Sequence, residues 1–198
     1  MTVTIGLTGS IATGKSTVSL MFEDFDIPVI DADKLAREVV NPGEEAYQLV
    51  VDTFGETILL EDKTLDRKLL GEIIFTDEAK RQQLNGIVHP AIRKKMIERR
   101  DALIAGGAAF VVLDIPLLFE SKLKHFVDKI IVVYVDEEIQ LQRLMARNDY
   151  TEEEALQRIR SQMPVKEKAQ LADAIINNNG SKHETFKQLE KIVSDWKT

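Results

Sequence analysis

An apolar, β-branched run at residues 3–8 leads directly into Gly9-Ser10-Ile11-Ala12-Thr13-Gly14-Lys15-Ser16. This segment matches the spacing G-x-x-x-x-G-K-[ST] in full, with a predicted buried strand before it and a predicted helix after it, at residues 15–24. Successive backbone N–H groups of such a loop form a concave anion site, and the positive end of the following helix adds to it. The sequence therefore predicts a strand–loop–helix unit that binds the phosphates of a nucleoside triphosphate.

Within this loop, side-chain type matters at four positions. Gly9 and Gly14 allow the turn, Lys15 reaches the β- and γ-phosphates, and the Ser16 hydroxyl is predicted to ligate Mg²⁺. The small residues between the glycines are expected to contribute backbone alone. The predicted nucleotide contacts are Ala12, Thr13, Gly14, Lys15, Ser16 and Thr17.

Short apolar runs recur along the rest of the chain and predict four further strands, at residues 27–30, 109–114, 129–135 and 174–177. Strands that are apolar on both faces belong in a parallel sheet covered by helices. The intervening helices are predicted at residues 32–40, 136–147, 151–162 and 181–196. This alternation predicts a doubly wound α/β fold with about five parallel strands flanked by helices.

Residues 41–105 differ in character from the rest. Asn41-Pro42-Gly43 stops one helix, and the amphipathic stretches at residues 44–60, 67–75 and 76–105 follow with no strand between them. Pro90 is expected to bend the longest of these helices. We therefore predict a mainly helical insert in the α/β domain.

Composition excludes several classes of protein. The 26 Lys and Arg residues against 33 Asp and Glu residues give a formal net charge of −7, whereas nucleic-acid binders usually carry a basic face. No apolar run approaches the roughly 20 residues needed to span a bilayer. There are no cysteines. We expect a cytoplasmic protein with no nucleic-acid or membrane partner, either monomeric or a weak homo-oligomer.

Three carboxylates follow predicted strands, where ligands bind in an open parallel sheet. A kinase needs one carboxylate to accept the proton of the attacking hydroxyl and others to hold Mg²⁺. We assign the first role to Asp33 and the second to Asp114. Asp31 has two open interpretations, a helix cap or a second support for Mg²⁺.

Arg143 and Arg147 are four residues apart and so share one face of a predicted helix. Two guanidinium groups placed in this way can clamp phosphate oxygens during transfer. The turn at residues 148–150 suits the hinge of a lid. His89, which precedes Pro90, fits either a structural role or a functional one.

A phosphate loop alone does not name a reaction, but the order of the motifs does. The chain resembles the dephospho-coenzyme A kinase family over essentially its whole length. The resemblance rests on residues 5–16, Val29-Ile30-Asp31-Ala32-Asp33, His89-Pro90, Asp114-Ile115-Pro116-Leu117-Leu118-Phe119-Glu120, Gln142-Arg143-Leu144 with Arg147, Arg160-Ser161-Gln162 and Asn178-Asn179-Gly180. Ser10, Ala12 and Thr13 depart from the commonest form of the loop, and Asn177 stands where Asp is frequent.

This resemblance implies ATP as the phosphoryl donor and dephospho-CoA as the acceptor, in a P-loop kinase fold with three parts. The parts are a nucleotide-binding core at residues 1–40, 106–136 and 171–198, a CoA-binding insert at 41–105 and a lid at 137–170. By position, Asp33 looks like the base and Arg143 like a lid contact to ATP. The implied acceptor contacts are Arg37, His89, Leu117, Leu118 and Phe119, and the implied adenine contacts are Asn178 and Gly180.

Two rival functions stay open on the sequence. The first is a kinase for another small molecule, such as a nucleoside or nucleotide. The apolar stretch at residues 117–119 argues against it, since a pantetheine arm needs an apolar groove and a bare nucleotide does not. The second is a module that binds ATP without phosphoryl transfer.

Overall fold

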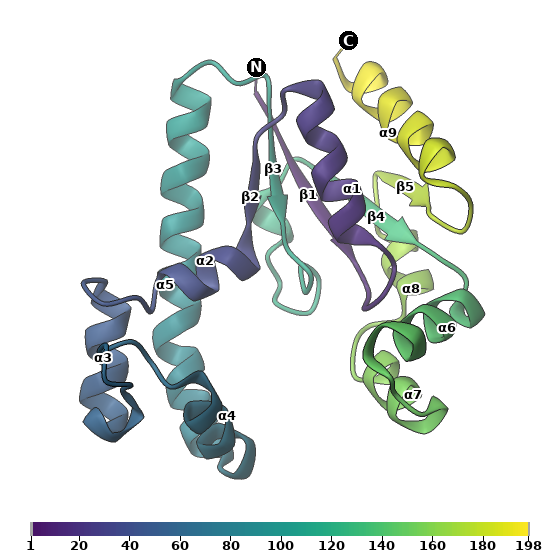
Figure 1. Cartoon of the computed structure of the whole chain (residues 1–198). Helices are drawn as coiled ribbons and strands as arrows, with labels where there is room; N and C mark the ends of the chain where they lie inside the picture. Colours follow the sequence, from purple (N-terminus) through teal and green to yellow (C-terminus); the bar gives the residue numbers. More distant parts are fainter. Residues whose placement is uncertain (1, 198) are drawn as a thin grey trace. The chain divides into compact units, whose positions relative to one another are not determined.

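The computed structural model describes residues 2–197, and the chain divides into two compact units. The first comprises Met1–Ile30 and Leu103–Thr198, and the second comprises Asp31–Ala102. The first contains the sheet, whereas the second is built from helices (Figure 1).

Five strands form one sheet in the order β2-β3-β1-β4-β5. Strand β1 pairs in parallel with β3 and with β4, and β4 pairs in parallel with β5. The strands are β1 (Val3–Gly9), β2 (Val29–Asp31), β3 (Phe110–Asp114), β4 (Lys129–Tyr134) and β5 (Ala174–Asn177). The predicted fold class, a five-stranded parallel sheet flanked by helices, is confirmed.

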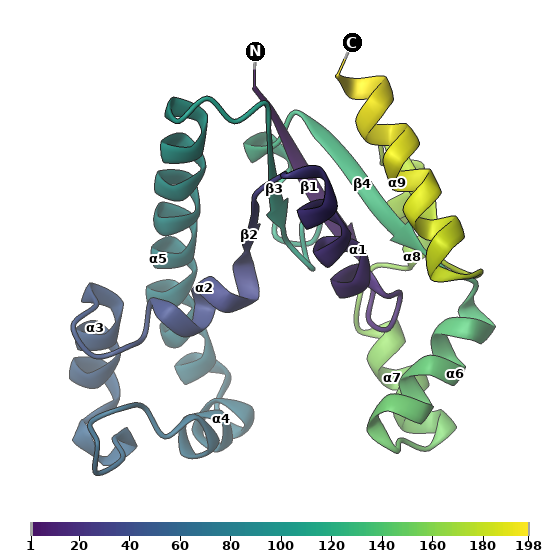
Figure 2. The same cartoon turned by 45° about the horizontal axis from the view of Figure 1, so that its top comes forward.

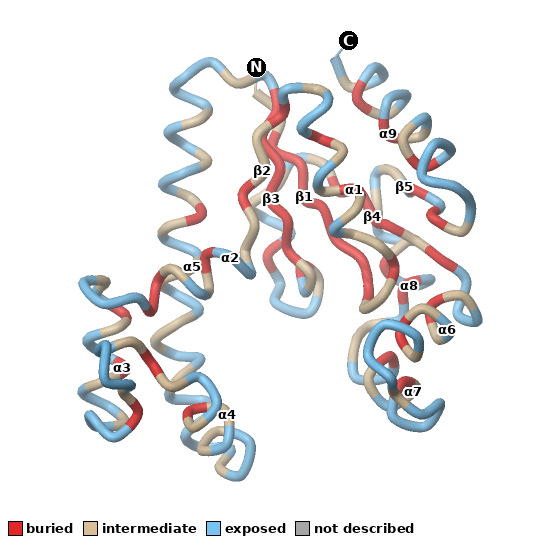
Figure 3. The backbone as a smooth tube through the Cα atoms, in the orientation of Figure 1, coloured by how far each residue is buried: buried red, intermediate tan, exposed pale blue. Residues whose placement is uncertain are grey.

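The central strands are almost completely buried, which is why their sequences are apolar on both faces. Every residue of β3 and all but the first of β1 are buried (Figure 3). In the sheet register Leu7 lies opposite Asp114, and Gly9 lies opposite Val133. The carboxyl ends of β1 and β3 therefore bring the phosphate loop and Asp114 to one edge of the sheet.

Two helices cover one region of this sheet. Helix α1 (Lys15–Met21) and helix α9 (Lys182–Trp196) contact each other and lie side by side (Figures 1 and 2). Val18 of α1 and Leu189 of α9 are buried in one apolar core with Leu7 of β1. This packing anchors α1, which begins at Lys15 of the phosphate loop, to the sheet.

The remaining helices of the first unit follow β4 in the chain. Helix α6 (Glu137–Asn148) and helix α7 (Glu152–Arg160) pack together around the buried side chains of Leu144 and Ile159. Helix α8 (Val165–Gln170) follows them and contacts β4. No helix among residues 2–197 is both long and apolar enough to cross a membrane.

The second unit has its own apolar core. Its helices are α2 (Ala32–Glu38), α3 (Glu45–Phe54), α4 (Arg67–Thr76) and most of α5 (Glu78–Ala105). Buried side chains such as Val50, Ile58 and Leu70 form the centre of this core. The helical character predicted for residues 41–105 is present, and α5 continues through Pro90.

Two predicted helices end earlier than expected, and one observed helix was not predicted. The helix predicted to reach residue 24 ends at Met21 and continues as a 3₁₀ turn, Phe22–Phe25. The helix predicted to reach residue 60 ends at Phe54, because Gly55 has a φ of 84°. Helix α8 was not predicted, since its six residues are too short to show a clear apolar period.

Candidate active site

The phosphate loop is shaped by hydrogen bonds within itself. The backbone N–H and the hydroxyl of Thr13 both donate to the Ser10 carbonyl oxygen, at 3.2 and 2.9 Å. Ala12 and Gly14 have left-handed backbone conformations, with φ of 60° and 87°. A Cβ added at Gly9 would lie 2.6 Å from the Thr13 hydroxyl oxygen. Gly9 is thus required by this close approach and Gly14 by its positive φ.

Ser10 and Ile11, which form the crest of the loop, are hydrogen-bonded to the segments that follow β4. Gln140 of α6 donates to the Ile11 carbonyl at 2.7 Å, and the Ile11 N–H donates to Gln162 at 2.9 Å. The Ser10 hydroxyl donates to the Met163 carbonyl at 3.1 Å. The expectation that Ser10 and Thr13 contribute backbone alone is therefore wrong, because both hydroxyls hold the loop in shape.

The end of the loop is tied to the segment after β5. The Asn178 side-chain nitrogen donates to the Thr13 carbonyl at 2.8 Å, and its oxygen accepts from the Thr185 hydroxyl of α9 at 2.8 Å. Asn178 is buried, and a buried amide needs hydrogen-bond partners. Here both ends of the side-chain amide have a protein partner. The Asn178 side chain thus supports the phosphate loop. Its contact with adenine stays a prediction.

Gly180 lies next to a helix cap. Glu184 of α9 accepts hydrogen bonds from the backbone and hydroxyl of Ser181, and a Cβ at Gly180 would lie 2.3 Å from the same carboxylate. The Ser181 backbone N–H and then its hydroxyl lower the pKa of Glu184 below its ordinary value. A side chain at position 180 would therefore displace the Glu184 carboxylate from its position in the helix cap.

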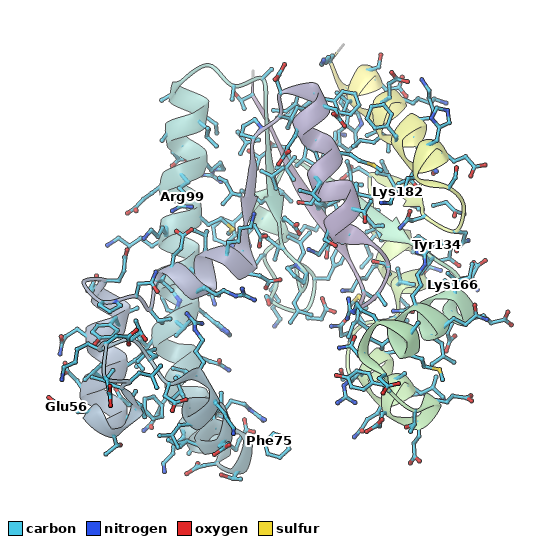
Figure 4. All side chains as sticks on the ribbon, viewed as in Figure 1. Glu56, Phe75, Arg99, Tyr134, Lys166 and Lys182 are labelled. Carbon is cyan, nitrogen blue, oxygen red and sulfur yellow. The ribbon has the colours of Figure 1, made fainter. Side chains whose placement is uncertain are left out.

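The carboxyl end of β4 is also held by hydrogen bonds to a carboxylate. Tyr134, which is labelled in Figure 4, donates its hydroxyl to the Asp136 carboxylate at 3.0 Å. The Asp136 carboxylate also accepts from the Asn179 side-chain amide at 3.0 Å. The hydrogen bond to the Asp136 carboxylate raises the pKa of Tyr134 above its ordinary value. The chain at residues 178–180 is therefore held from both β4 and α9.

Two predicted charged residues meet at the loop. The Lys15 ammonium forms an ion pair with the Asp114 carboxylate, and both side chains are largely buried. Ser16, the next residue, is exposed at the start of α1. The structure thus brings Lys15 and Asp114 together at the phosphate loop, as the strand order predicts.

The two arginines of α6 have different surroundings. Arg143 donates to the Asn178 carbonyl at 3.0 Å, and its guanidinium lies 3.9 Å from the Cβ position of Gly14. Arg147 is exposed and donates to the side chain of its neighbour Asn148 at 2.8 Å. Of the predicted arginine pair, Arg143 is therefore the one beside the loop.

The three apolar residues after β3 also differ. Leu118 is 0% exposed and packs against the position of Gly6 in β1, whereas Leu117 is 41% exposed. Phe119 is intermediate between them. Leu118 is thus part of the core, and Leu117 and Phe119 are the two that offer apolar surface to a ligand.

The remaining predicted residues belong to the second unit. Asp31 caps α2, because its carboxylate accepts from the backbone N–H groups of Asp33 and Lys34 at 2.8 and 3.1 Å. The side chains of Asp33 and Arg37 are exposed and lie one helical turn apart on α2. His89 is exposed on α5. The helix-cap interpretation of Asp31 is confirmed.

A parallel α/β sheet whose first strand leads into this phosphate loop defines the P-loop kinase class. The family model described as dephospho-CoA kinase matches residues 3–184. The chain belongs to the dephospho-CoA kinase family. The predicted enzyme class, an ATP-dependent kinase of dephospho-CoA, is confirmed by this membership.

Relatives and solved structures agree with this membership. Dephospho-CoA kinases of Oceanobacillus iheyensis and Geobacillus kaustophilus are 58% and 57% identical over 196 residues, which cover 99% of this chain and 98% of each relative. The structure of dephospho-CoA kinase from Campylobacter jejuni is 33% identical with a TM-score of 0.77, over 98% of this chain and 97% of that one. A crystal structure of a Thermus thermophilus protein is 32% identical with a TM-score of 0.82, over 100% and 98% of the two chains.

The site also contains residues that sequence reasoning did not select. Gln140 holds the loop but stands in a charged helix, where a lone Gln carries no signal. Lys168 is completely buried, although it lies in a run of charged residues typical of a solvent-exposed face. Only the tertiary contacts distinguish these two residues from their exposed neighbours.

Proposed function

We propose that this chain transfers the γ-phosphoryl group of ATP to the ribose 3′-hydroxyl of dephospho-CoA. The observation that carries the proposal is the arrangement at the phosphate loop, where Lys15 and Arg143 bring two positive charges to a shaped anion site. Family membership supports the same donor and acceptor.

In the proposed reaction the 3′-oxygen attacks the γ-phosphorus and forms a new O–P bond. The bond from the γ-phosphorus to the β–γ bridging oxygen breaks, and ADP leaves. Asp33 accepts the proton of the hydroxyl, and its exposed position on α2 supports this role. Arg37, one turn further along α2, and His89 of α5 contact the acceptor.

We propose that lysine and arginine side chains, together with Mg²⁺, stabilise the negative charge on the transferred phosphoryl group. Lys15 exchanges its partner Asp114 for phosphate oxygens, and Arg143 and Arg147 contact the phosphates from α6. The oxygen ligands of Ser16 and Asp114 fit Mg²⁺, which prefers hard oxygen donors. When bound there, Mg²⁺ would neutralise charge on the β- and γ-phosphates.

Several finer assignments belong to the same proposal. Residues 41–105 bind the CoA side of the acceptor, with Leu117 and Phe119 offering apolar contact and Leu118 supporting them from the core. Residues 137–170 act as a lid, and Asn178 and Gly180 lie at the adenine. We further propose a cytoplasmic enzyme that is monomeric or weakly associated.

The direct test combines the protein with γ-labelled ATP, Mg²⁺ and dephospho-CoA, in competition with nucleosides. We expect label on CoA alone and none without Mg²⁺. Label on a nucleoside would favour the rival kinase, and tight ATP binding without any labelled product would favour a binding module. The Lys15→Met variant should lose about 10²–10³ in turnover, since it removes one charge-stabilising donor, whereas the exposed Lys182→Met should not.

A further inference from the structure

Lys168 is a buried cation without a role in the reaction described above. Its side chain is 0% exposed, in a helix of six residues. An ammonium group has three N–H donors, and three acceptors surround this one: the carbonyl oxygens of Gly9 and Pro116 at 3.1 and 3.2 Å, and the Glu120 carboxylate at 2.9 Å. The ammonium therefore donates hydrogen bonds to the two carbonyls and forms an ion pair with the carboxylate.

The three acceptors come from two segments that the proposed reaction requires. Gly9 ends β1 and begins the phosphate loop. Pro116 and Glu120 flank the apolar residues that follow Asp114 at the end of β3. The Lys168 side chain thus joins the phosphate loop, which is proposed to bind ATP, to the segment that is proposed to contact dephospho-CoA.

The Glu120 carboxylate extends this connection to the crest of the loop. The same oxygen that pairs with Lys168 accepts from the Met163 N–H at 3.2 Å, and the Met163 carbonyl accepts from the Ser10 hydroxyl at 3.1 Å. The Lys168 side chain is completely buried and the Glu120 side chain is 25% exposed, so the pair is screened less than one between two exposed side chains. The contacts form a closed ring from the loop through Met163 and Glu120 to Lys168 and back to the loop.

Burying an ammonium group is costly, and one carboxylate and two carbonyls compensate it here. An apolar residue would fill the same space in helix α8 without that cost. The contacts instead fix the Gly9 carbonyl relative to Pro116 and Glu120, and a displacement of about 1 Å in an active site can cost about 10²-fold in rate.

We infer that Lys168 is a positioning residue for phosphoryl transfer, which sets the spacing between the phosphate loop and the segment at residues 116–120. This inference rests on the proposed function of the loop and of that segment. It predicts an effect on kcat rather than on nucleotide affinity, because Asn178, Gln140 and Gln162 still hold the loop.

The test compares Lys168→Met with Lys166→Met, an exposed lysine on the same helix (Figure 4). Each variant is assayed well below its melting temperature, after its folded fraction has been measured. We expect kcat of folded Lys168→Met to fall by about 10- to 100-fold, with the Kd for ATP changed by less than about threefold. Lys166→Met should match the unaltered protein in both.

Amide hydrogen exchange supplies a second readout. Loss of the Lys168 contacts should raise exchange in peptides covering residues 8–14 and 116–123, and leave α9 unchanged. The variant Glu120→Gln keeps the shape of the side chain and removes its charge, so it should lower kcat by at least about threefold.

The inference is overturned if folded Lys168→Met keeps kcat within about threefold of Lys166→Met, even when its melting temperature is lower. If Lys168→Met does not fold, the same criterion applied to Glu120→Gln decides. A failure of the proposed function looks different, since the unaltered protein itself would then place no label on CoA.

Discussion

Asn178 donates its side-chain N–H to the Thr13 carbonyl at 2.8 Å, and so joins the end of the edge strand β5 to the phosphate loop. The Thr185 hydroxyl donates to the other end of the same amide, which turns the nitrogen toward the loop. Arg143 donates to the Asn178 main-chain carbonyl at 3.0 Å. One buried residue thus contacts the loop through its side-chain amide and Arg143 through its main-chain carbonyl.

The first prediction concerns this amide. In Asn178→Asp a carboxylate oxygen faces the Thr13 carbonyl, so a hydrogen bond becomes a repulsion between two acceptors. We expect the free energy of unfolding to fall by about 1–3 kcal/mol and ATP binding to weaken. Chemical denaturation and ATP titration measure the two effects.

Asn177→Asp is the matched control for this variant. The Asn177 side-chain oxygen accepts from the Asn179 N–H at 3.0 Å, and a carboxylate retains that bond. It should therefore leave stability and ATP affinity nearly unchanged. Equal losses in the two variants would show that added charge, rather than the bond to Thr13, is responsible.

The second prediction concerns Gly14. Its φ is 87°, and an added Cβ would lie 2.1 Å from the Asn178 side-chain nitrogen. Gly14→Ala should therefore displace Asn178 and reduce ATP affinity by at least about tenfold, which corresponds to about 1.4 kcal/mol. Calorimetric titration with ATP measures this loss.

Gly71→Ala provides the contrast. Gly71 lies within α4, and apart from its two chain neighbours and the backbone of its own helix no atom lies within 4 Å of its Cβ position. Alanine is favoured over glycine inside a helix by about 0.5–1 kcal/mol, so this variant should melt at a higher temperature and bind ATP normally. Unchanged ATP binding in Gly14→Ala would contradict the proposed geometry of the loop.

The third prediction separates the two carboxylates of α2. Asp33→Asn should lower turnover by about 10²–10⁴, the range for a general base, while ATP affinity changes little. Asp31→Asn should keep turnover, because Asn caps a helix about as well as Asp and Asp31 accepts from the Asp33 and Lys34 N–H groups. Steady-state kinetics on both variants tests the assignment.

Two outcomes would change that assignment. Full activity in Asp33→Asn would remove Asp33 as the base. An equal loss in Asp31→Asn, with an intact helix, would give Asp31 a role at the site beyond capping.

The fourth prediction concerns pH. Hydrogen bonds from the backbone and hydroxyl of the capping residue lower the pKa of Glu184 in α9 and of Glu154 in α7. Because the pKa of each carboxyl group is lower in the folded protein, the unfolded chain binds protons more readily as the pH falls. The stabilisation from these two caps is therefore fully present above the pKa of Glu in the unfolded chain, about 4.3, and is lost as the pH falls through the lower pKa of the folded protein. The melting temperature should therefore decrease on acidification below about pH 5.

Glu184→Gln isolates this contribution. Gln retains a capping hydrogen bond but does not titrate, so its melting temperature should depend less steeply on pH between about 3 and 5 than that of the unaltered protein. Identical slopes for the two proteins would exclude Glu184 as a source of the acid sensitivity.

Local sequence was sufficient for most of the elements and for the loop. The run of apolar residues before Gly9 predicted β1, and the spacing to Lys15 and Ser16 predicted the phosphate site. At the start of α5 the Asp77 carboxylate accepts a hydrogen bond from the Lys80 backbone N–H, which is only three residues away. These features depend on residues within one or two turns of each other, so a linear pattern reveals them.

The details that shape the loop depend on residues far apart in the chain. Gln140, Asn178 and Lys168 lie between 129 and 165 positions from their loop partners. Nothing in the local sequence separates buried Lys168 from exposed Lys166, because both stand in the same charged run. In the sequence, Leu117, Leu118 and Phe119 form one apolar stretch with no difference between them. Only the tertiary structure, in which Leu118 packs against Gly6, places Leu118 in the core.

The sequence by itself determined the parallel α/β fold, the phosphate loop and the family, since each is written in short apolar runs and in the order of local motifs. Tertiary structure alone decided which polar side chains hold that loop in place. The physical reason is that a buried donor or acceptor must find a partner, and the partner is chosen by the packing of the sheet and its helices rather than by neighbours in the chain.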